Sequence, residues 1–350
     1  MRIFLYMFLS LGLCSCASTS KVAVKVKEKL LPLAISNQQA KQVSTSTDAL
    51  SLEDFKQSLL HDSVVSAQTI DDFFSRVVFR ADLLELMDRP STAKPWYQYV
   101  EHVPLGYLCE RGVDFYRRHQ TVLKKVSQKT GVAPEYIAAV LGVETRYGEL
   151  KGSYRVADSL YTYAFYYPRR AAFFQQELRE FFQLYQKQGR DPFSYLGSYA
   201  GAMGYPQFMP SSYRRWALSY GQTRYPDIWD NVEDAIASVA NYLQKQGWRK
   251  NFAVVYPVLL QDQSMAHALF TKRVNFDYRF AQVKHQGVFS RAPLQDQEVV
   301  GLFALQTGPS QWSYYLGSDN LYALWHYNHS ANYIMLVDRL ASLIRAEVSL

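Results

Sequence analysis

Residues 134–148 read Pro-Glu-Tyr-Ile-Ala-Ala-Val-Leu-Gly-Val-Glu-Thr-Arg-Tyr-Gly, an apolar stretch with one carboxylate, Glu144, near its end. The proline and the glutamate that open the stretch are typical of the first turn of a helix. In a helix Val140 and Leu141 lie four and three residues before Glu144, so the three side chains share one face. The stretch therefore predicts a helix that projects a carboxylate from its apolar face, towards the core or into a cleft.

Two roles are open to a glutamate in this position. Burial disfavours the charged carboxylate and raises its pKa, which is what a general acid that works near neutral pH requires. The alternative is a structural glutamate in the core, paired with an arginine or a lysine, because structural ion pairs also perturb pKa values. The position of Glu144 in a helix does not by itself decide between them.

A second unusual segment, residues 197–213, reads Gly-Ser-Tyr-Ala-Gly-Ala-Met-Gly-Tyr-Pro-Gln-Phe-Met-Pro-Ser-Ser-Tyr. Its glycines allow the backbone to approach a ligand closely. A turn that is also rich in methionine and aromatic residues is not typical of a plain solvated linker. The segment is therefore a candidate part of a binding site.

Together the two segments resemble the membrane-bound lytic murein transglycosylase B family, which is glycoside hydrolase family 103. The resemblance spans about residues 90–345, and its further motifs, in the order that the family requires, are residues 164–171, 228–230, 234–242 and 327–330. It implies a lysozyme-like helical core. It also implies a lytic transglycosylase that acts in cell-wall turnover and remodelling. Such an enzyme cleaves the β-1,4 bond between N-acetylmuramic acid and N-acetylglucosamine in peptidoglycan and leaves 1,6-anhydromuramic acid.

The motifs offer a single clear carboxylate, whereas most glycosidases use two. Glu149 lies five residues beyond Glu144, so it is expected on a different face and in solvent. Asp158, Asp191 and Asp230 lie in turn-like settings, where helix capping is the expected role. A site with one carboxylate fits the implied reaction. In that reaction Glu144 first protonates the glycosidic oxygen and then takes the proton of the muramyl C6 hydroxyl group.

The resemblance also implies a set of substrate-binding residues around the catalytic Glu144. Aromatic rings stack on the faces of sugars, while amide and hydroxyl groups orient the N-acetyl groups and ring hydroxyls. With 27 tyrosines and 20 phenylalanines in the chain, most other aromatic residues are expected to pack in the core. The implied substrate-binding residues are Tyr99, Ser198, Gln207, Phe208, Tyr242, Tyr327, Asn328 and Tyr333.

The remaining sequence predicts an α+β fold that is mainly α-helical. Apolar residues recur with helical spacing over residues 71–84, 113–130, 170–187, 232–246 and from about 332 onwards. Short strand-like runs, separated by turn residues, occupy residues 253–256, 273–276, 299–305 and 321–325. We therefore expect a transglycosylase domain over residues 49–350, with a small β-sheet inserted at about 253–326 before the C-terminal helix.

The N-terminus is typical of an exported lipoprotein. Arg2 precedes an apolar stretch, residues 3–13, that is too short to span a bilayer. The sequence Leu-Cys-Ser-Cys-Ala that follows indicates a signal peptide over residues 1–16, acylation of Cys16 and a flexible tether over residues 17–48. The alanine after Cys16 indicates sorting to the outer membrane, facing the periplasm. The alternative is ordinary secretory cleavage nearby, which would give a soluble periplasmic protein.

The net charge of +7 does not indicate nucleic-acid binding, because the basic residues are scattered and no nucleic-acid-binding motif is present. The expected partners are peptidoglycan glycan strands, the outer membrane through the lipid anchor, and cell-wall synthases. After maturation Cys109 would be the one remaining cysteine. It is therefore expected in the core, without an intrachain disulfide.

No metal and no cofactor are expected. Members of the family that this sequence resembles can carry a calcium loop rich in Asp and Asn. The corresponding stretch here is residues 219–227. This stretch keeps one carboxylate, Asp227, and places Arg224 near the expected ion position, whereas calcium needs several oxygen ligands. His326 and His329 have no carboxylate or cysteine at ligand spacing, so a zinc site is not expected.

The sequence leaves two other functions open. One is a lysozyme-type peptidoglycan hydrolase, in which a second carboxylate helps Glu144 to activate water. The other is a non-catalytic peptidoglycan-binding lipoprotein that has kept the binding residues. The mass of the digestion products separates the first from a transglycosylase, and a turbidity assay on purified sacculi tests the second.

Overall fold

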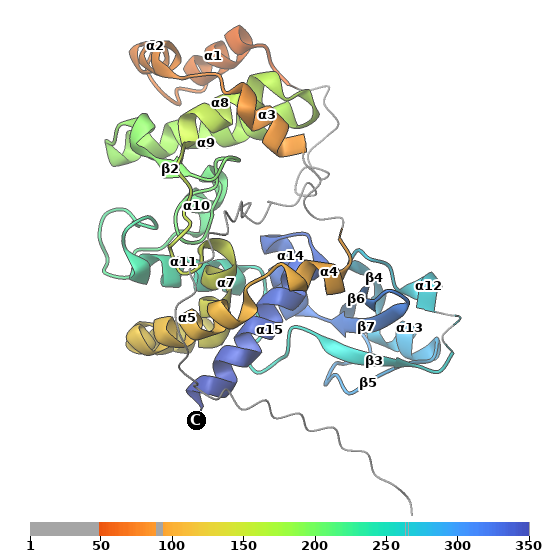
Figure 1. Ribbon diagram of the computed structural model, residues 1–350. Coiled ribbons are helices and arrows are strands. Elements are labelled where there is room, and N and C mark those ends of the chain that lie inside the picture. The colour runs from red at the N-terminus through yellow and green to blue at the C-terminus, as the bar shows by residue number, and fades with distance from the viewer. Residues whose placement is uncertain (1–48, 89–93, 263, 265, 350) are drawn as a thin grey trace, which may run out of the picture. The chain divides into compact units, whose positions relative to one another are not determined.

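The computed structural model describes residues 49–88, 94–262, 264 and 266–349, and Figure 1 shows their arrangement. The predicted signal peptide, the acylated Cys16 and the tether over residues 17–48 lie outside the described residues. The α-helices are α1 Leu52–His61, α2 Ala67–Arg76, α3 Ala81–Asp88, α4 Trp96–Glu101, α5 Leu105–Arg118, α6 Gln120–Thr130, α7 Pro134–Thr145, α8 Val156–Tyr166, α9 Ala171–Gln188, α10 Pro210–Trp216, α11 Val232–Lys245, α12 Ala266–Leu269, α13 Phe280–His285, α14 Asp319–Tyr327 and α15 Ala331–Val348. The strands are β1 Tyr154–Arg155, β2 Leu196–Gly197, β3 Tyr256–Leu260, β4 Asn275–Arg279, β5 Val288–Ser290, β6 Val299–Gly308 and β7 Gln311–Gly317. Two short 3-10 helices, η1 Pro168–Arg170 and η2 Pro192–Ser194, flank α9.

The helix boundaries follow from local chemistry. Pro134 occupies the first position of α7, where its missing N–H leaves no hydrogen bond unmade. The side chain of Asn231 caps α11 by accepting hydrogen bonds from two first-turn amides. Gly131 ends α6 in the left-handed conformation, with φ 76°. The predicted starts of α7 and α11 are confirmed.

Helix α7 forms the centre of the helical core. It packs against α5, α6, α11 and α15, and Figure 1 shows α15 passing beside α5 and α7. Ile137, Val140 and Leu141 are fully buried. A side chain near the end of α7 is therefore attached to a helix that its neighbours hold in place from several sides.

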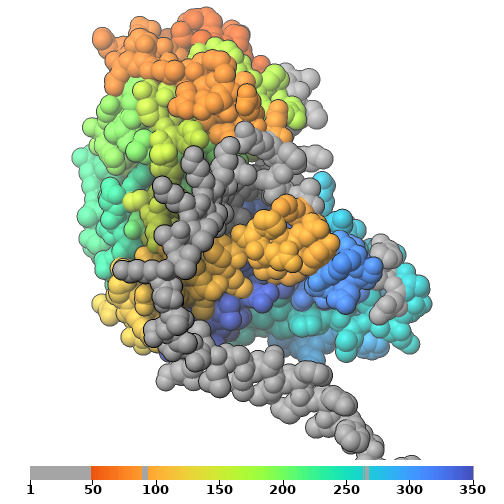
Figure 2. Space-filling model, in the orientation of Figure 1, coloured from red at the N-terminus to blue at the C-terminus, as the bar shows by residue number. Residues whose placement is uncertain are grey.

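An N-terminal layer made of α1, α2 and α3 covers α8 and α9. Arg76 of α2 forms an ion pair with Asp191, at 2.9 Å. The backbone N–H of Val78 donates to Asp158 Oδ1, at 3.0 Å. Figure 2 shows the red and orange side chains of this layer resting on the green ones of α8 and α9.

A five-stranded antiparallel sheet, in the order β4-β6-β7-β3-β5, precedes α14. Phe303 of β6 stacks on Tyr315 of β7, at 5.5 Å between ring centroids, and belongs to the main helical core. Val258, Val283 and Val288 belong to a second, smaller core that joins the sheet to α12 and α13. The predicted α+β class, mainly helical with a small sheet, is confirmed.

The structure corrects three element predictions. Residues 71–84 are not one helix, because the N–H groups of Val78 and Arg80 bond to side chains of α8 and so interrupt it. Residues 113–130 are divided between α5 and α6 at His119, whose φ is −109°. Residues 321–325 were predicted as a strand but belong to α14, so two helices follow the sheet.

Two further findings concern membrane-spanning helices and Cys109. In the parts of the chain that the structure describes, no helix is both long and apolar enough to cross a membrane. Cys109 is partly buried against the helical core, so it is more exposed than predicted.

Candidate active site

Glu144 is the penultimate residue of α7, and its carboxyl group meets a tyrosine from the far end of the chain. The Tyr333 hydroxyl donates to Glu144 Oε1, at 2.7 Å. Burial raises the pKa of Glu144 to about 7, although the hydrogen bond from Tyr333 acts in the opposite direction. Glu144 nevertheless remains partly exposed. It is therefore a carboxylic acid that exchanges its proton near neutral pH and can be reached.

The backbone after Glu144 turns sharply and is held in place. Arg146 and Tyr147 both adopt the left-handed conformation, with φ of 51° and 60°. The Tyr147 hydroxyl reaches back to donate to the carbonyl oxygen of Leu108, at 2.9 Å. A Cβ atom at residue 142 would collide with the Tyr147 ring, so Gly142 is what lets this ring fold onto α7. The strained turn thus fixes the end of α7 and the position of Glu144.

Five aromatic residues gather around Glu144, and we call them, with Glu144, the Glu144 cluster. Tyr333 stacks on Tyr327 at 6.3 Å between ring centroids, and Tyr327 meets Tyr242 edge-on at 4.8 Å. Phe208 lies 5.7 Å from the ring of Tyr242. Tyr99 is close enough for the charge of Glu144 to contribute to the rise in its pKa, after burial. The cluster comprises Glu144, Tyr99, Phe208, Tyr242, Tyr327 and Tyr333.

Two tyrosine hydroxyls of the cluster donate to backbone carbonyl oxygens. Tyr327 donates to the carbonyl oxygen of Pro206, and Tyr242 to that of His326, both at 2.7 Å. Burial raises the pKa of both tyrosines above the ordinary value, so both remain neutral at physiological pH. The cluster therefore surrounds the carboxyl group with uncharged rings.

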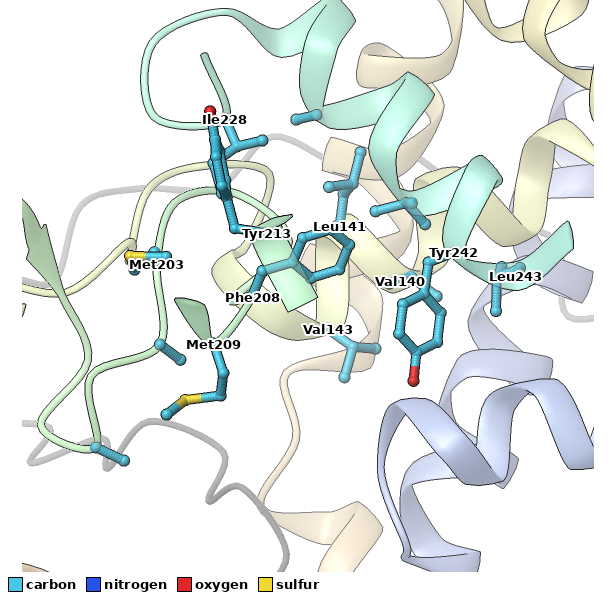
Figure 3. Packing of buried hydrophobic residues seen from close by; sticks show 14 of the residues in the cluster. Val140, Leu141, Val143, Met203, Phe208, Met209, Tyr213, Ile228, Tyr242 and Leu243 are labelled. Carbon is cyan, nitrogen blue, oxygen red and sulfur yellow. The ribbon is translucent and has the colours of Figure 1, made fainter. Parts of the chain in front are cut away.

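The segment that carries Phe208 is a compact double turn. Ser198 N–H donates to the carbonyl oxygen of Ala202, at 2.8 Å, and Met203 and Phe208 exchange backbone hydrogen bonds. Gly204 adopts a φ of 65°, and a Cβ atom there would collide with the carbonyl oxygen of Ile228. Figure 3 shows Phe208 and Tyr242 approaching Val140, Leu141 and Val143 of α7 from two different segments. Gly204 thus allows the backbone of the double turn to pack closely against Ile228.

Three predicted binding residues make no hydrogen bond to Glu144 among the described residues. The Ser198 hydroxyl accepts from Ala202 N–H, at 3.1 Å. The Gln207 amide donates to the carbonyl oxygens of Lys151 and Gly204. Oδ1 of Asn328 is buried and has no hydrogen-bond partner in the described part of the chain. Such an acceptor is typically satisfied by a water molecule or a ligand.

Comparisons with known proteins agree with this geometry. Residues 48–342 match the protein family described as the transglycosylase SLT domain. Membrane-bound lytic murein transglycosylase B of Escherichia coli (strain K12) is 34% identical over 287 residues, which are 79% of this chain and 78% of that protein. This chain belongs to the lytic murein transglycosylase family.

Two solved structures of lytic transglycosylases extend the comparison. Soluble lytic transglycosylase SltB1 of Pseudomonas aeruginosa superposes with a TM-score of 0.77 at 35% identity, over 85% of this chain and 99% of that one. SltB3 of the same organism, in complex with NAG-anhNAM-pentapeptide, superposes with a TM-score of 0.70 at 26% identity, over 85% of this chain and 80% of that one. The family assignment drawn from the sequence motifs is confirmed.

In this lytic transglycosylase the other candidate carboxylates are engaged elsewhere. Asp158 forms an ion pair with Arg155 and accepts from Val78 N–H. Asp191 caps the 3-10 helix η2. Glu149, which is exposed, accepts from the Tyr107 hydroxyl. The structure therefore gives none of these carboxylates a place beside Glu144.

Sequence analysis missed the residues that join the two motifs. Thr145 Oγ1 donates to the carbonyl oxygen of Tyr205, at 3.2 Å, which ties the end of α7 to the double turn. The ammonium group of Lys151 lies 5.0 Å from the centroid of the Tyr205 ring. Thr145 lies inside the quoted motif and directly follows Glu144, so its position could have marked it as a candidate site residue. The carbonyl oxygens involved leave no signal in a sequence.

We expect Tyr333→Phe to move the alkaline limb of the pH profile of kcat/KM to higher pH. The Tyr333 hydroxyl stabilises the charged carboxylate and so lowers the pKa of Glu144; without it that pKa rises. A general acid is active while protonated, so the limb follows its pKa. Tyr242→Phe is the matched control, because its hydroxyl donates to His326 O and not to Glu144. An unmoved limb in Tyr333→Phe, or an equal shift in both variants, would contradict the assignment.

Residues 219–227, the stretch compared above with a calcium loop, are held by hydrogen bonds to Asp234 of α11, and Asp227 within the stretch accepts from the backbone that follows it. The two oxygens of Asp234 accept from Tyr220 N–H and Asp227 N–H, at 2.7 and 2.8 Å. Asp227 accepts from Trp229 N–H and Asp230 N–H, at 2.9 and 3.0 Å. Three of the carboxylate oxygens nearby, both of Asp234 and Oδ1 of Asp227, thus already accept from backbone amides, whereas calcium needs several oxygen ligands.

We expect EDTA to leave both the Tm and the activity unchanged within error. A bound calcium ion would stabilise the folded state by mass action, so its removal would lower the Tm. Thermal unfolding with EDTA, with added calcium and with neither is the measurement. A Tm that falls by several degrees in EDTA and recovers with calcium would show that backbone carbonyls complete a site.

Proposed function

We propose that this protein cleaves the β-1,4 bond between N-acetylmuramic acid and N-acetylglucosamine in peptidoglycan as a lytic transglycosylase, with Glu144 as both acid and base. The observation that carries the proposal is the state of Glu144. Its pKa is raised to about 7 by burial, which the Tyr333 hydrogen bond opposes, and no second carboxylate among the described residues contributes. A hydrolase with two carboxylates places them about 5–9.5 Å apart, where each would perturb the other.

In the first step the protonated Glu144 donates its proton to the glycosidic oxygen, and the bond between that oxygen and C1 of the muramyl residue breaks. N-acetylglucosamine leaves with the proton, and positive charge develops at C1. In the second step the Glu144 carboxylate takes the proton of the muramyl C6 hydroxyl, whose oxygen bonds to C1. Glu144 is protonated again, and no water is consumed. A pKa near 7 suits both half-reactions, because either protonation state is reached at little cost.

The surrounding residues support this chemistry. The uncharged tyrosines of the Glu144 cluster offer ring faces to sugars. The unsatisfied Oδ1 of Asn328 can accept a hydrogen bond from an N-acetyl N–H or a ring hydroxyl. We assign Tyr99, Phe208, Tyr242, Tyr327 and Tyr333 to walls of the substrate site. Ser198 and Gln207 hold the double turn and contribute their remaining hydrogen-bonding capacity.

Digestion of purified sacculi in water enriched in heavy oxygen tests the proposal. A transglycosylase releases muropeptides lighter by one water than the reducing products, and these carry no heavy oxygen at the muramyl C1. Reducing products that incorporate heavy oxygen would show a hydrolase. No release of soluble material, with retained binding to sacculi, would show a binding protein.

For the location of the protein we propose an outer-membrane lipoprotein that faces the periplasm and is anchored through Cys16. Two observations support this location. One is the sequence around Cys16, and the other is the similarity to the Escherichia coli protein whose name describes it as membrane-bound. Membership of the family places the protein where peptidoglycan lies, in the cell envelope. Cell-wall synthases are proposed partners there, and their co-purification with the intact protein from solubilised membranes tests this.

We expect Cys16→Ala to leave the membrane fraction and keep its activity in solution. Acylation of this cysteine is the anchor that the sequence indicates, and the tether carries no residue of the Glu144 cluster. Fractionation after a salt wash, with an activity assay on each fraction, is the measurement. A variant that remains with the membranes would favour another anchor.

A further inference from the structure

The double turn that carries Phe208 is attached to the helical core at both of its ends. At its start β2 pairs with β1. At its end the chain continues directly into α10, which begins at Pro210, two residues after Phe208. Figure 3 shows Phe208, Met209 and Tyr213 along this continuation, and α10 packs against α9. The position of Phe208 therefore depends in part on how α10 is fixed to α9.

Glu177 of α9 engages the first turn of α10 with both of its carboxyl oxygens. Pro210 has no N–H, so the N–H of Ser211 is the first amide of α10 that needs an acceptor from outside the helix. It donates to Glu177 Oε2, at 2.9 Å, and the Ser211 hydroxyl donates to Glu177 Oε1, at 2.6 Å. One side chain thus binds both donor groups of a residue that follows Phe208 by three positions.

The contact between Glu177 and Ser211 is built into the core. Glu177 is 4% exposed, and its neighbours on α9, Leu178 and Phe181, are fully buried. Water therefore has little access to replace the carboxyl group as the partner of Ser211. Removal of the carboxyl group would leave a donor of Ser211 without an acceptor, which is costly in a buried place.

The hydrogen bonds of Glu177 do not require its charge. Burial raises the pKa of Glu177 to about 7, although the two hydrogen bonds from Ser211 oppose this rise. The charged groups that face Glu177 are Glu180 of α9, which raises its pKa further, Arg215 of α10, which lowers it, and Arg170. Both protonation states are therefore populated near neutral pH. In the protonated state one oxygen still accepts from Ser211 N–H, while the other donates to the hydroxyl oxygen of Ser211.

We propose that Glu177 is a positioning residue of the substrate site, which holds Phe208 in the Glu144 cluster through its two hydrogen bonds to Ser211. The inference rests on the proposed function, in which Phe208 forms a wall of the substrate site. Glu177 acts through the double turn and takes no part in proton transfer. Its hydrogen bonds, and not its charge, carry the effect.

Three substitutions of Glu177 in the full protein separate hydrogen bonding from charge. Glu177→Gln keeps the length of the side chain, an acceptor for Ser211 N–H and a donor for Ser211 Oγ, but removes the charge. Glu177→Asp keeps a carboxyl group that is shorter by one methylene, so it does not reach both groups of Ser211. Glu177→Ala removes both contacts.

Two measurements are made on each variant, well below its Tm. One is kcat and KM on soluble glycan strands that keep their peptides. The other is binding of glycan strands from which an amidase has removed the peptides, measured in the same variants carrying Glu144→Gln so that no cleavage occurs.

We expect Glu177→Ala and Glu177→Asp to raise KM and weaken strand binding by roughly tenfold, within the loss of about 100-fold that a misplacement of about 1 Å can cause. The value of kcat should change less, because contacts with a wall of the site are made in the ground state and the transition state alike. Glu177→Gln should show nearly parental values. A parental KM in Glu177→Ala would overturn the proposal. So would Glu177→Gln as impaired as Glu177→Ala, which would assign the effect to charge.

Glu180→Ala is the matched control for lost stability. Glu180 lies one turn further along α9, is 2% exposed and forms an ion pair with Arg214 of α10. The side chain of Arg214 is 47% exposed and can turn into solvent, whereas the N–H of Ser211 is fixed in the backbone. Both alanine variants should lower the Tm, and only Glu177→Ala should raise KM. An equal rise of KM in Glu180→Ala would overturn the specific role of Glu177.

The pH profile and the products separate this proposal from a role in the chemistry and from the proposed function. The alkaline limb of kcat/KM should lie at the same pH in Glu177→Gln as in the parent, and a limb that moves would show that titration of Glu177 controls the site. If Glu177→Ala does not fold, the milder Glu177→Asp, compared with Glu177→Gln, decides the question. Reducing products from any variant would refute the transglycosylase reaction and leave the binding comparison standing. Unchanged strand binding would refute the positioning role and leave the reaction standing.

Discussion

Glu144→Gln is expected to reduce the rate of peptidoglycan cleavage by about 100- to 10,000-fold, the usual contribution of general acid–base catalysis. The amide keeps the shape of the side chain and can still accept a hydrogen bond from Tyr333. It can neither donate a proton to the leaving oxygen nor take one from the C6 hydroxyl, and in the proposed reaction one residue performs both steps. Release of soluble muropeptides from sacculi, measured over several hours, is the readout.

The matched control for this change is Glu149→Gln. Glu149 lies five residues further on, is exposed, and contacts Tyr107 and Arg111. Its amide should lose little more than an exposed ion pair, which is worth about 0–1 kcal/mol. Residual activity of Glu144→Gln above roughly a tenth of the parent would fall short of the lower end of acid–base catalysis and would disprove the role of Glu144.

The Glu144→Gln substitution should lower activity but should not lower thermal stability at alkaline pH. The folded pKa of Glu144, about 7, lies above its ordinary value of 4.5, so the folded state holds this proton more tightly than the unfolded state does. The contribution of the group to stability is therefore full below pH 4.5 and is lost as pH rises towards 7. Because the amide cannot ionise, Glu144→Gln should unfold at an equal or higher temperature than the parent at pH 8. A lower Tm at that pH would indicate a structural role for the carboxylate.

The helix that carries Glu144 could be predicted from the sequence, because its signals are local. The apolar spacing before Glu144 and the proline at the start of α7 depend on residues within one helix. The hydrogen bond from Tyr333 spans 189 positions of the chain, so no periodicity could reveal it. Tyr333 entered the prediction only through the resemblance to a family.

The element errors have different causes, and the first is tertiary hydrogen bonding that overrides a local pattern. The helix predicted over residues 71–84 ends at Arg76 because the backbone of Val78 and Arg80 bonds to Asp158 and Thr162. Strand β7 was not predicted. Most of its residues are half-buried on both faces, so apolar and polar residues do not alternate along it. The short apolar run of residues 321–325 predicts a strand, although Leu321 and Leu324 are buried at helical spacing.

Gly204→Ala is expected to lower both stability and activity, because it changes the turn that carries Phe208. A left-handed alanine costs about 1–2 kcal/mol, and insertion of a Cβ atom into a packed site costs about 1–3 kcal/mol more. The added atom would meet the carbonyl oxygen of Ile228, which already accepts from Tyr205 N–H at 2.9 Å. The turn must move away from Ile228, and Gln207 and Phe208 move with it. A fall in Tm of several degrees is expected.

Gly189→Ala separates strain in the backbone from the collision. Gly189 has the same φ of 65°, at the end of α9, but an added Cβ atom there meets nothing within 4 Å. Both variants therefore carry the cost of a left-handed alanine, and only Gly204→Ala carries the displacement of the turn. Well below the Tm of either variant, Gly189→Ala should cleave sacculi at the parental rate, whereas Gly204→Ala should be slower and bind the substrate more weakly. Equal activities at that temperature would mean that the position of Phe208 does not depend on this contact, and the role assigned to the double turn would be wrong.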